Sequence, residues 1–338
     1  MLSYLEVNNG FIELSSKKNA EIAPEWLQLP NKVSLKYLCQ GILEVKPAQL
    51  AKKSVVISCG VHGNETAPIE IVSGLISRIV TGSIEPKVNL LFILGNPESM
   101  LISQRFVEIN MNRLFNKAHQ NYELNEKTRY EIERAIVLEN AVSDFYERYN
   151  TTSKQHFDLH TAIKPSFHKT FAIRPYNNMP MERESKKLLA SMGIEAVLQH
   201  NKPSNTFSAF SVETFDAEAY TLELGKVKPF GENDMQDFCK AIECLDNLVQ
   251  DKAIGGASST DIIEYKVVAE VIKQSENFKF NVAEDVPNFT AFPQGYLIAE
   301  DDNYNYRVAY FEEAVVFPNP NVPIGQRVAV MVTRISED

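Results

Sequence analysis

The sequence predicts an α/β sandwich followed by a small all-β domain. Between residues 51 and 250, short apolar segments rich in β-branched residues alternate with segments of helical periodicity. After residue 261 the helical periodicity disappears, and short β-rich segments are separated by Pro, Gly and Asn. Strands that alternate with helices imply an open sheet, largely parallel or mixed, with helices packed against it.

The first half of the sandwich begins with a buried strand at Ser54–Cys59, which is apolar and β-branched. A turn with Gly and Asn follows, and apolar residues then recur at helical spacing from Ile69 to Ile79. A second buried strand, Val88–Leu94, ends at the sequence Gly-Asn-Pro. The charged segment Asn125–Asn150 lacks Pro and Gly and repeats apolar residues every three or four positions, so a long amphipathic helix is expected there.

The second half continues the alternation of strands and helices. Strands are expected at residues 155–161, 169–174, 196–199 and 220–224, and helices at residues 182–192 and 230–250. Glu232 and Asp234 near the start of the last helix suit the positive end of a helix dipole.

A change of composition divides the chain into two expected domains. The segment Asp251–Asp261 is small and polar, as is typical of a linker. We therefore expect a catalytic domain over residues 1–255 and a β-rich domain over residues 256–338. Expected strands of the second domain lie at residues 265–272, 296–299, 314–317 and 327–332.

The composition also bounds the partners of the protein. The chain has 338 residues, a net charge of −10 and a pI near 5.3, so it has no basic excess to bind a nucleic-acid backbone. No apolar run approaches the roughly 18 to 20 residues that span a bilayer, and no signal peptide is apparent. The four cysteines form no CxxC pair, as expected of free thiols in the cytoplasm. The expected partner is a small anionic molecule, with no nucleic acid and no membrane; a homodimer is left open.

The first chemical motif is the sequence Gly-Val-His-Gly-Asn-Glu at residues 60–65, where a buried strand ends and a helix should begin. His62 and Glu65 are three residues apart in a glycine-containing turn, so their side chains can converge on one point. Zn²⁺ accepts both ligand types and needs a third protein ligand, which leaves one position for water. Alone this pair is a weak signal, because a chain of this length can contain one by chance.

His160 is the candidate for a third ligand. It lies at the carboxyl end of an apolar strand, where the active sites of open α/β sheets gather. Asp158 precedes it by two residues on the same face of the strand and could hydrogen-bond to the imidazole. The alternative is a core histidine bonded to a backbone carbonyl, and His62 and Glu65 favour the ligand instead. His168 and His200 also lie near strand ends, and both interpretations stay open for them.

Glu223 is the candidate general base because it interrupts an otherwise apolar strand. A buried carboxylate is costly unless it is paired or bound, and burial raises its pKa toward the range that suits proton transfer. The alternative is a structural ion pair with Lys226 or Lys228. We favour the catalytic role.

Arginines after the second buried strand are candidates for anion recognition. Arg105 and Arg113, with the neighbouring Asn112, fall within one segment, residues 105–115. A guanidinium group binds a carboxylate in a bidentate manner and can also polarise an amide carbonyl. Arg174, at the end of a later strand, and Lys226 are further candidates for substrate contacts.

Four motifs in order resemble those of the succinylglutamate desuccinylase and aspartoacylase family, a branch of the zinc carboxypeptidase-like hydrolases. They are GVHGNE, RFVEINMNRLF, FDLHTA and TLELGKVKPFGEND, and the last is more similar to the desuccinylases. The likeness covers most of the first 250 residues. It implies a zinc-carboxypeptidase-like α/β/α sandwich with a mixed sheet, and a smaller β domain that covers the active-site mouth.

The resemblance also implies roles for individual residues. One zinc ion per subunit would be held by His62, Glu65 and His160, and Glu223 would serve as base and proton shuttle. Arg105 would polarise the scissile carbonyl.

By the same resemblance, Asn112 and Arg113 would hold a substrate carboxylate. The sequence departs from the family at Asn110, where the family often has an acid, so altered hydrogen bonding around the site is expected.

The implied reaction is hydrolysis of N-succinyl-L-glutamate to succinate and L-glutamate, the last step of arginine degradation by the succinyltransferase route. Three carboxylates on the substrate would explain why an acidic protein needs arginines in its cleft. The alternatives with the same chemistry are an aspartoacylase-like deacylase of N-acyl amino acids and a small metallocarboxypeptidase. A zinc-binding protein without catalysis is the alternative of a different class.

Overall fold

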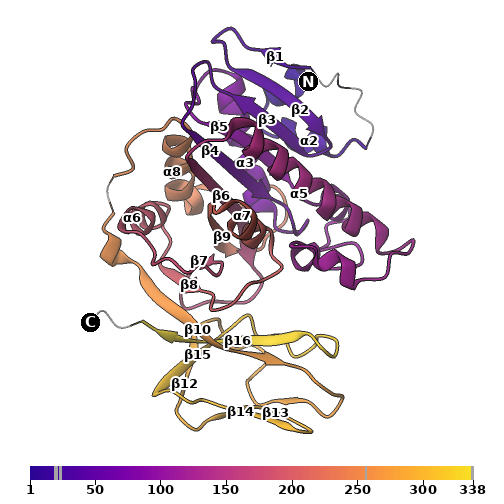
Figure 1. Ribbon diagram of the computed structural model, residues 1–338, viewed down its shortest axis with the longest axis vertical. Coiled ribbons are helices and arrows are strands. Elements are labelled where there is room, and N and C mark those ends of the chain that lie inside the picture. The colour runs from indigo at the N-terminus through magenta and orange to yellow at the C-terminus, as the bar shows by residue number, and fades with distance from the viewer. Residues whose placement is uncertain (19–21, 23–24, 256, 336–338) are drawn as a thin grey trace.

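The computed structural model describes residues 1–18, 22, 25–255 and 257–335 (Figure 1). Within these residues the strands form a 13-stranded mixed sheet and a separate three-stranded sheet. The order in the large sheet is β1-β2-β3-β5-β4-β6-β9-β7-β8-β10-β16-β15-β12. This arrangement confirms the expected α/β fold with a mixed sheet.

Four parallel strands form the centre of the large sheet: β5 (Asn89–Leu94), β4 (Lys53–Cys59), β6 (Ser153–Ala162) and β9 (Glu218–Lys226). Nearly every residue of these strands is buried, as continuous apolar runs predict for strands covered on both faces. Because the strands are parallel, their carboxyl ends meet at one edge of the sheet. The polar residues that follow β4, β5 and β6 therefore lie close together.

Antiparallel strands flank this centre and make the sheet mixed. On one side lie β3 (Ile42–Lys46), β2 (Ser34–Cys39) and β1 (Leu27–Gln28). On the other side β7 (Phe171–Arg174) runs antiparallel to β9 and parallel to β8 (Ala196–Gln199). The strands expected at 169–174 and 196–199 are thus confirmed.

Helices cover both faces of the sheet. One face packs against α3 (Thr66–Val80), α6 (Arg183–Ser191) and α8 (Cys239–Val249), and the other against α5 (Arg129–Tyr149) and α7 (Phe207–Phe215). Successive residues of β4 alternate between the two cores: Val55 and Ile57 belong to one and Val56 to the other. This alternation follows from the pleat of a strand and defines an α/β/α sandwich. The shorter helices are α1 (Leu2–Leu5), α2 (Gly10–Ser15), α4 (Pro97–Leu101), η1 (Met111–Arg113), η2 (Ala118–Asn121), η3 (Met235–Phe238) and η4 (Ser259–Asp261).

The helix expected at residues 230–250 is shorter than predicted. Its α-helical part, α8, begins at Cys239, after the 3₁₀ turn η3 that Asp234 caps by accepting from Gln236 N. Glu70 of α3 accepts hydrogen bonds from Gly231 N and Asn233 Nδ2, which ties this segment to the side of α3. The tertiary contacts therefore override the helical periodicity there.

The C-terminal strands extend the large sheet. β10 (Ile263–Ile272) pairs in parallel with β8, followed by β16 (Arg327–Arg334), β15 (Glu312–Val316) and β12 (Thr290–Pro293). The small sheet contains β11 (Lys279–Phe280), β13 (Leu297–Asp301) and β14 (Tyr304–Arg307). Figure 1 shows these strands as a separate lower body, orange to yellow, beneath the sandwich.

The expected domain boundary between residues 255 and 256 involves residue 256, which lies outside the described residues. Among the helices that the structure describes, none is long and apolar enough to cross a membrane.

Candidate active site

The turn between β4 and α3 carries His62 and Glu65. Gly60 adopts a positive φ of 61°, which favours glycine. A Cβ atom on Gly63 would lie 2.1 Å from Met100 N, so no larger residue fits there. The two glycines thus allow a turn tight enough to place a histidine and a glutamate three residues apart on one side.

His62, Glu65 and His160 converge, and together they are named here the His–Glu–His triad. His62 Nδ1 lies 2.9 Å from Glu65 Oε1, and His160 Nδ1 lies 2.8 Å from Glu65 Oε2. One ligand atom from each of the three residues falls within 4.8 Å of the others. All three side chains are buried. Because the triad joins the end of β4 to the end of β6, the parallel pairing of these strands brings it together.

Each imidazole of the triad lies between two hydrogen-bond acceptors. His62 Nε2 is 3.0 Å from Asn110 Oδ1, an oxygen that also accepts from Asn112 N. His160 Nε2 is 2.9 Å from Asp158 Oδ2, as the sequence suggested for Asp158. In this chain the partner of His62 at that position is therefore an amide oxygen, that of Asn110.

The pKa values at the triad reflect this crowding of acceptors. Burial and the nearby Arg105 charge lower the pKa of His62 to about 4, so its imidazole is neutral. Burial opposes ionisation of Glu65, but the two imidazoles outweigh it and hold its pKa well below the usual range. Burial likewise opposes protonation of His160, but Asp158 and Glu65 outweigh it and raise its pKa well above the usual value.

Glu223 lies on β9 directly opposite His160 in the β6–β9 register. Its side chain is buried, and Oε2 has no hydrogen-bond partner among the residues that the structure describes. Burial and the negative charge of Glu65 raise its pKa to about 7. Within the described chain no salt bridge joins Glu223 to Lys226 or Lys228, so the structural ion pair considered from the sequence is not formed.

Arg105 reaches the triad from the segment that follows α4. Its NH1 donates to Glu65 Oε1 at 2.6 Å, and about a third of its side chain is exposed, at 32%. The guanidinium thus lies between the triad and solvent, where a substrate would arrive.

The segment that carries Arg105 is held by a buried carboxylate from α5. Glu131 is fully buried and accepts from the backbone N–H groups of Val107, Glu108 and Ile109 at 2.7, 3.0 and 2.7 Å. Without these bonds, three backbone donors near Arg105 would lack a partner. The sequence offered no sign of this role, because Glu131 fits the polar face of the long helix equally well.

Asn112 and Arg113 lie in the 3₁₀ turn η1. Asn112 Oδ1 accepts from Phe207 N at 2.9 Å, so its amide is used in part to anchor the start of α7. Arg113 NH1 donates to the carbonyl of Asn112 at 2.6 Å. Burial and the positive charges of Arg327 and Arg105 lower the pKa of Arg113 to about 9.

Within the described residues, neither Arg174 nor Lys226 forms a hydrogen bond or an ion pair with the triad. The Arg174 guanidinium donates to the carbonyl of Met179 at 2.8 Å and to Gln199 at 3.4 Å. Lys226 is exposed at the end of β9. The contacts of Arg174 stabilise the loop after β7.

Sequence reasoning missed a cluster of charged residues at the junction of the two domains, which includes Arg327 and Glu270. Both lie on strands of the C-terminal part, β16 and β10. That part carries no recognisable motif, so only the tertiary structure identifies them.

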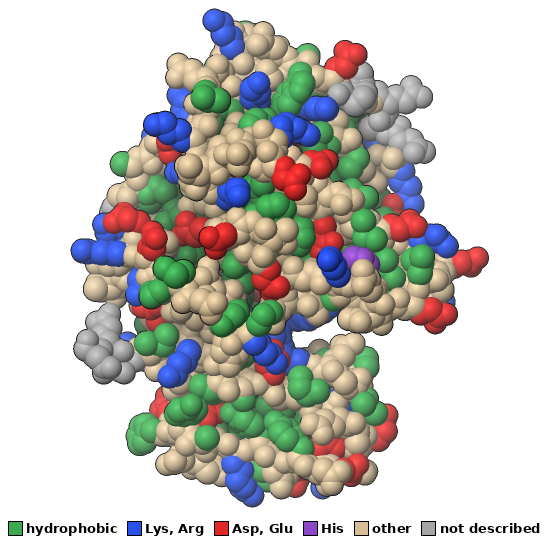
Figure 2. Space-filling model, viewed as in Figure 1, with side chains coloured by type: hydrophobic (Ala, Val, Ile, Leu, Met, Phe, Trp, Pro, Cys, Tyr) green, Lys and Arg blue, Asp and Glu red, His purple; other side chains and the backbone are tan. Residues whose placement is uncertain are grey.

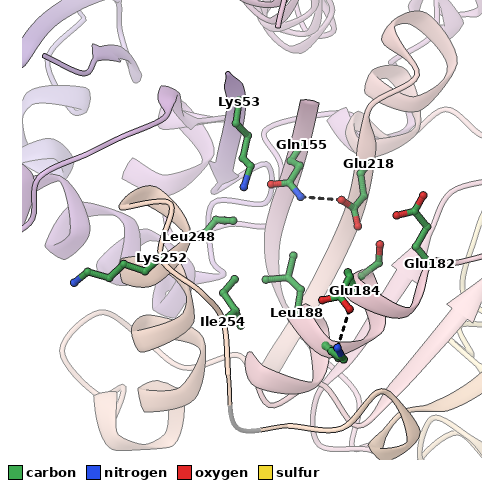
Figure 3. Close-up of a pocket in the computed structure, with 11 residues that line it drawn as sticks. Lys53, Gln155, Glu182, Glu184, Leu188, Glu218, Leu248, Lys252 and Ile254 are labelled. Atoms are coloured by element: carbon green, nitrogen blue, oxygen red, sulfur yellow. Dashed lines mark hydrogen bonds and ion pairs between the residues drawn. The ribbon is translucent and has the colours of Figure 1, made fainter. Parts of the chain in front are cut away.

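A surface hollow lies at the opposite end of the sheet from the triad (Figure 3). It is lined by Lys53, Gln155 and Glu218, the residues at the amino ends of β4, β6 and β9, and by residues of α6 and α8. Gln155 Nε2 donates to Glu218 Oε2 at 2.8 Å in its lining. The hollow is therefore separate from the triad.

The triad fits a zinc ion in ligand type, number and charge. Two imidazoles and one carboxylate form a set typical of catalytic zinc sites. A neutral imidazole has one N–H, yet His62 faces an acceptor at both nitrogens. If the hydrogen is on Nε2 and is donated to Asn110 Oδ1, no hydrogen is left between Nδ1 and Glu65 Oε1. A cation bound there would attract both of these atoms.

The fold and the site define the class of protein as a hydrolase built on an α/β/α sandwich, and two family models match the chain. Residues 51–248 match the family model described as the succinylglutamate desuccinylase/aspartoacylase catalytic domain. Residues 260–335 match the AstE/AspA barrel-sandwich hybrid domain. The chain belongs to the succinylglutamate desuccinylase/aspartoacylase family.

Individual relatives resemble the chain over nearly its whole length. It is 38% identical over 326 residues to the succinylglutamate desuccinylase of Yersinia pestis (strain Pestoides F), covering 96% of each chain. The solved succinylglutamate desuccinylase of Vibrio parahaemolyticus superposes with a TM-score of 0.85 at 37% identity, over 96% of this chain and 95% of that one. The enzyme of the same name from Vibrio cholerae gives a TM-score of 0.86 at 34% identity, over 97% and 96%.

Proposed function

We propose that this protein hydrolyses the amide bond of N-succinyl-L-glutamate to succinate and L-glutamate, with one zinc ion held by His62, Glu65 and His160. The observation that carries the proposal is the convergence of the triad beside a buried carboxyl group, Glu223, that lacks a hydrogen-bond partner in the described chain. The identity to succinylglutamate desuccinylases over 96% of the chain supports the choice of substrate. When bound, the zinc ion supplies a Lewis acid that acidifies water and polarises a carbonyl oxygen.

Glu223 is the proposed general base and acid. With a pKa raised to about 7, it can accept a proton from the attacking water near neutral pH and return it to the leaving nitrogen. The water oxygen forms a bond to the succinyl carbonyl carbon as the C–N bond breaks. The two protons of the water end on the glutamate amine, and succinate leaves as a carboxylate.

Arg105 and Arg113 are the proposed anion-binding groups. Arg105 lies beside the triad and is partly exposed, so its guanidinium can donate to the carbonyl oxygen as negative charge develops there. Arg113 lies in the neighbouring turn and forms no ion pair within the described residues, so it can bind a substrate carboxylate. Asn112 supports Arg113 through its carbonyl. Arg174 and Lys226 have no part in this proposal, because neither contacts the triad within the described residues.

The proposal extends to where the reaction takes place. All four cysteines are free, as is usual for proteins of a reducing compartment. We therefore propose that the reaction takes place in the cytoplasm on a small anionic substrate.

The test is a comparison of three substrates with the purified protein: N-succinylglutamate, N-acetylaspartate and a short peptide. We expect kcat/KM to be highest for N-succinylglutamate. Faster hydrolysis of N-acetylaspartate would favour the aspartoacylase alternative, and faster hydrolysis of the peptide would favour the carboxypeptidase. No turnover of any of the three would contradict the proposal.

Glu223→Gln separates an enzyme from a zinc-binding protein without catalysis. The variant should keep one zinc per chain, because Glu223 is outside the triad, and lose activity by about 10²- to 10⁴-fold. The matched control is Glu218→Gln, which removes a carboxylate from the other end of the same strand. The control should keep its activity. A fully active Glu223→Gln would contradict the role of Glu223.

A further inference from the structure

Five polar residues meet where the C-terminal strands join the sandwich, and they are named here the interdomain cluster. The cluster comprises Arg113 of η1, His200 and Lys202 after β8, Glu270 of β10 and Arg327 of β16. Figure 2 shows a notch between the two bodies of the molecule, with Lys and Arg side chains inside it. The pairing of β8 with β10 and of β10 with β16 brings residues of both domains to this place.

Glu270 is the acidic member of the cluster and is shared between two cations. Its Oε2 lies 2.5 Å from Lys202 Nζ, and its Oε1 lies 3.2 Å from Arg327 NH1. Burial opposes ionisation of Glu270, but the hydrogen bond from Lys202 and the charge of Arg327 outweigh it and lower its pKa. The carboxylate is therefore ionised, and its charge is already engaged.

Arg113 has no carboxylate partner among the described residues. A second arginine, Arg327, is near it. The NH1 group of Arg113 donates a hydrogen bond to the carbonyl of Asn112. Its lowered pKa, about 9, reports burial together with repulsion by Arg327 and Arg105. A half-buried guanidinium with a second one nearby is costly unless an anion lies close to both.

The cluster as a whole carries more positive than negative charge. Arg113, Lys202 and Arg327 contribute three positive charges, and Glu270 contributes one negative charge. Burial and the charge of Arg327 lower the pKa of His200 to about 4, so this imidazole is neutral. Its Nδ1 is buried and has no hydrogen-bond partner among the described residues. A surplus of cations beside an unpartnered ring nitrogen suits an anionic ligand with oxygen atoms.

We propose that Arg327 and Arg113 form a carboxylate site that spans the two domains, and that one carboxylate of the substrate completes it. A guanidinium group offers a planar pair of N–H donors that can bind the two oxygens of a carboxylate. Arg327 is then a specificity residue supplied by the C-terminal domain. An N-acyl amino acid without that carboxylate would leave the cations unpaired and would be rejected.

This inference rests on the proposed function, since the ligand is a carboxylate of its substrate. N-Succinylglutamate has three carboxylates, and the charge of the cluster does not distinguish between them. The experiment therefore uses three analogues that each lack one. N-Butyrylglutamate lacks the acyl carboxylate, N-succinylnorvaline lacks the side-chain carboxylate, and N-succinyl-4-aminobutyrate lacks the α-carboxylate.

The test variant is Arg327→Gln, and Glu270 still has Lys202 as a partner after this change. We expect kcat/KM for N-succinylglutamate to fall about 10- to 100-fold, mainly through a higher KM. The loss should disappear for the one analogue that lacks the recognised carboxylate and persist for the other two. Arg327→Lys keeps the charge but not the planar fork, so it should show a smaller loss with the same selectivity.

The matched control is Arg334→Gln, which removes the same charge from the exposed far end of β16. It should leave kcat/KM within twofold of wild type. A loss below twofold in Arg327→Gln, or an equal loss for all four substrates, would overturn the inference. If the wild-type protein does not hydrolyse N-succinylglutamate at all, the proposed function itself fails, so the two failures are distinct.

Discussion

The region around the triad and the interdomain cluster differ in the sign of their unbalanced charge. At the strand ends, the carboxylates of Glu65, Asp158 and Glu223 surround two imidazoles and one arginine. At the domain junction, three cations share the one carboxylate of Glu270. The first region therefore suits a bound cation and the second suits a bound anion.

The difference also shows how each region is built. The triad is assembled by neighbouring parallel strands of one domain, and its own ring nitrogens and carboxylate oxygens are all in hydrogen-bond contact. The interdomain cluster depends on the junction of two domains and leaves Arg113 and His200 with unused bonding capacity. This contrast suggests that the first region serves chemistry and the second serves recognition, and each of the following predictions tests one side of it.

Removal of a triad residue should have the largest effect. His160→Ala deletes one of the three donors, so the zinc content should fall from one per chain to near zero after dialysis. Turnover should fall by about 10³-fold or more. Metal analysis and a kcat measurement check both results, with Glu223→Gln as the variant that keeps the metal. Full zinc content in His160→Ala would contradict the assignment of the triad.

Arg113→Gln should weaken recognition more than chemistry. Loss of a charge-assisted carboxylate contact should raise KM by about 10- to 100-fold while kcat changes less. Arg113→Lys should lie between this variant and the wild type. Arg129→Gln, which removes an arginine from an exposed ion pair on α5, is the control. An unchanged KM in Arg113→Gln would remove Arg113 from the anion site.

The pH profile should report the ionisation of Glu223. The base must be deprotonated, so kcat/KM should fall about tenfold per pH unit below the pKa of this group and level off above it. The pKa is raised to about 7 by burial and by Glu65. A bound divalent cation lowers the pKa of a nearby carboxyl, so the acidic limb in the zinc enzyme should lie at about 7 or below. A flat profile from pH 5 to 8 would contradict this role.

Glu131→Gln should give the smallest effect. It tests the backbone segment that carries Arg105 and Arg113. Glutamine cannot accept from all the backbone donors that Glu131 satisfies, so the free energy of unfolding should fall by about 1–3 kcal/mol. The loosened segment carries Arg105 and Arg113, so KM should also rise, while the zinc content stays at one. Urea unfolding and steady-state kinetics measure both. An unchanged KM in a destabilised variant would show that the segment keeps its shape without Glu131.

Much of the site was predictable from sequence because it is encoded locally. The turn at residues 60–65 places His62 beside Glu65 through nearby glycines, and the ends of buried strands identify His160 and Glu223. The strands and most helices of the sandwich follow from hydrophobic periodicity, which is also a local property. The start of α8 was mispredicted because contacts with Glu70 decide it, and these join segments far apart in sequence.

The sequence by itself predicted the α/β/α sandwich, the three residues of the triad and the buried carboxyl group of Glu223. Only the tertiary structure decided that Arg174 bonds to its own loop, that Glu131 holds the arginine segment, and that Arg327 lies near Arg113. The physical reason is the range of the interactions involved. Periodicity and turn chemistry act between neighbours in the chain, whereas the charge cluster between the domains brings together Arg113 and Arg327, which are more than 200 residues apart, and no local pattern records this.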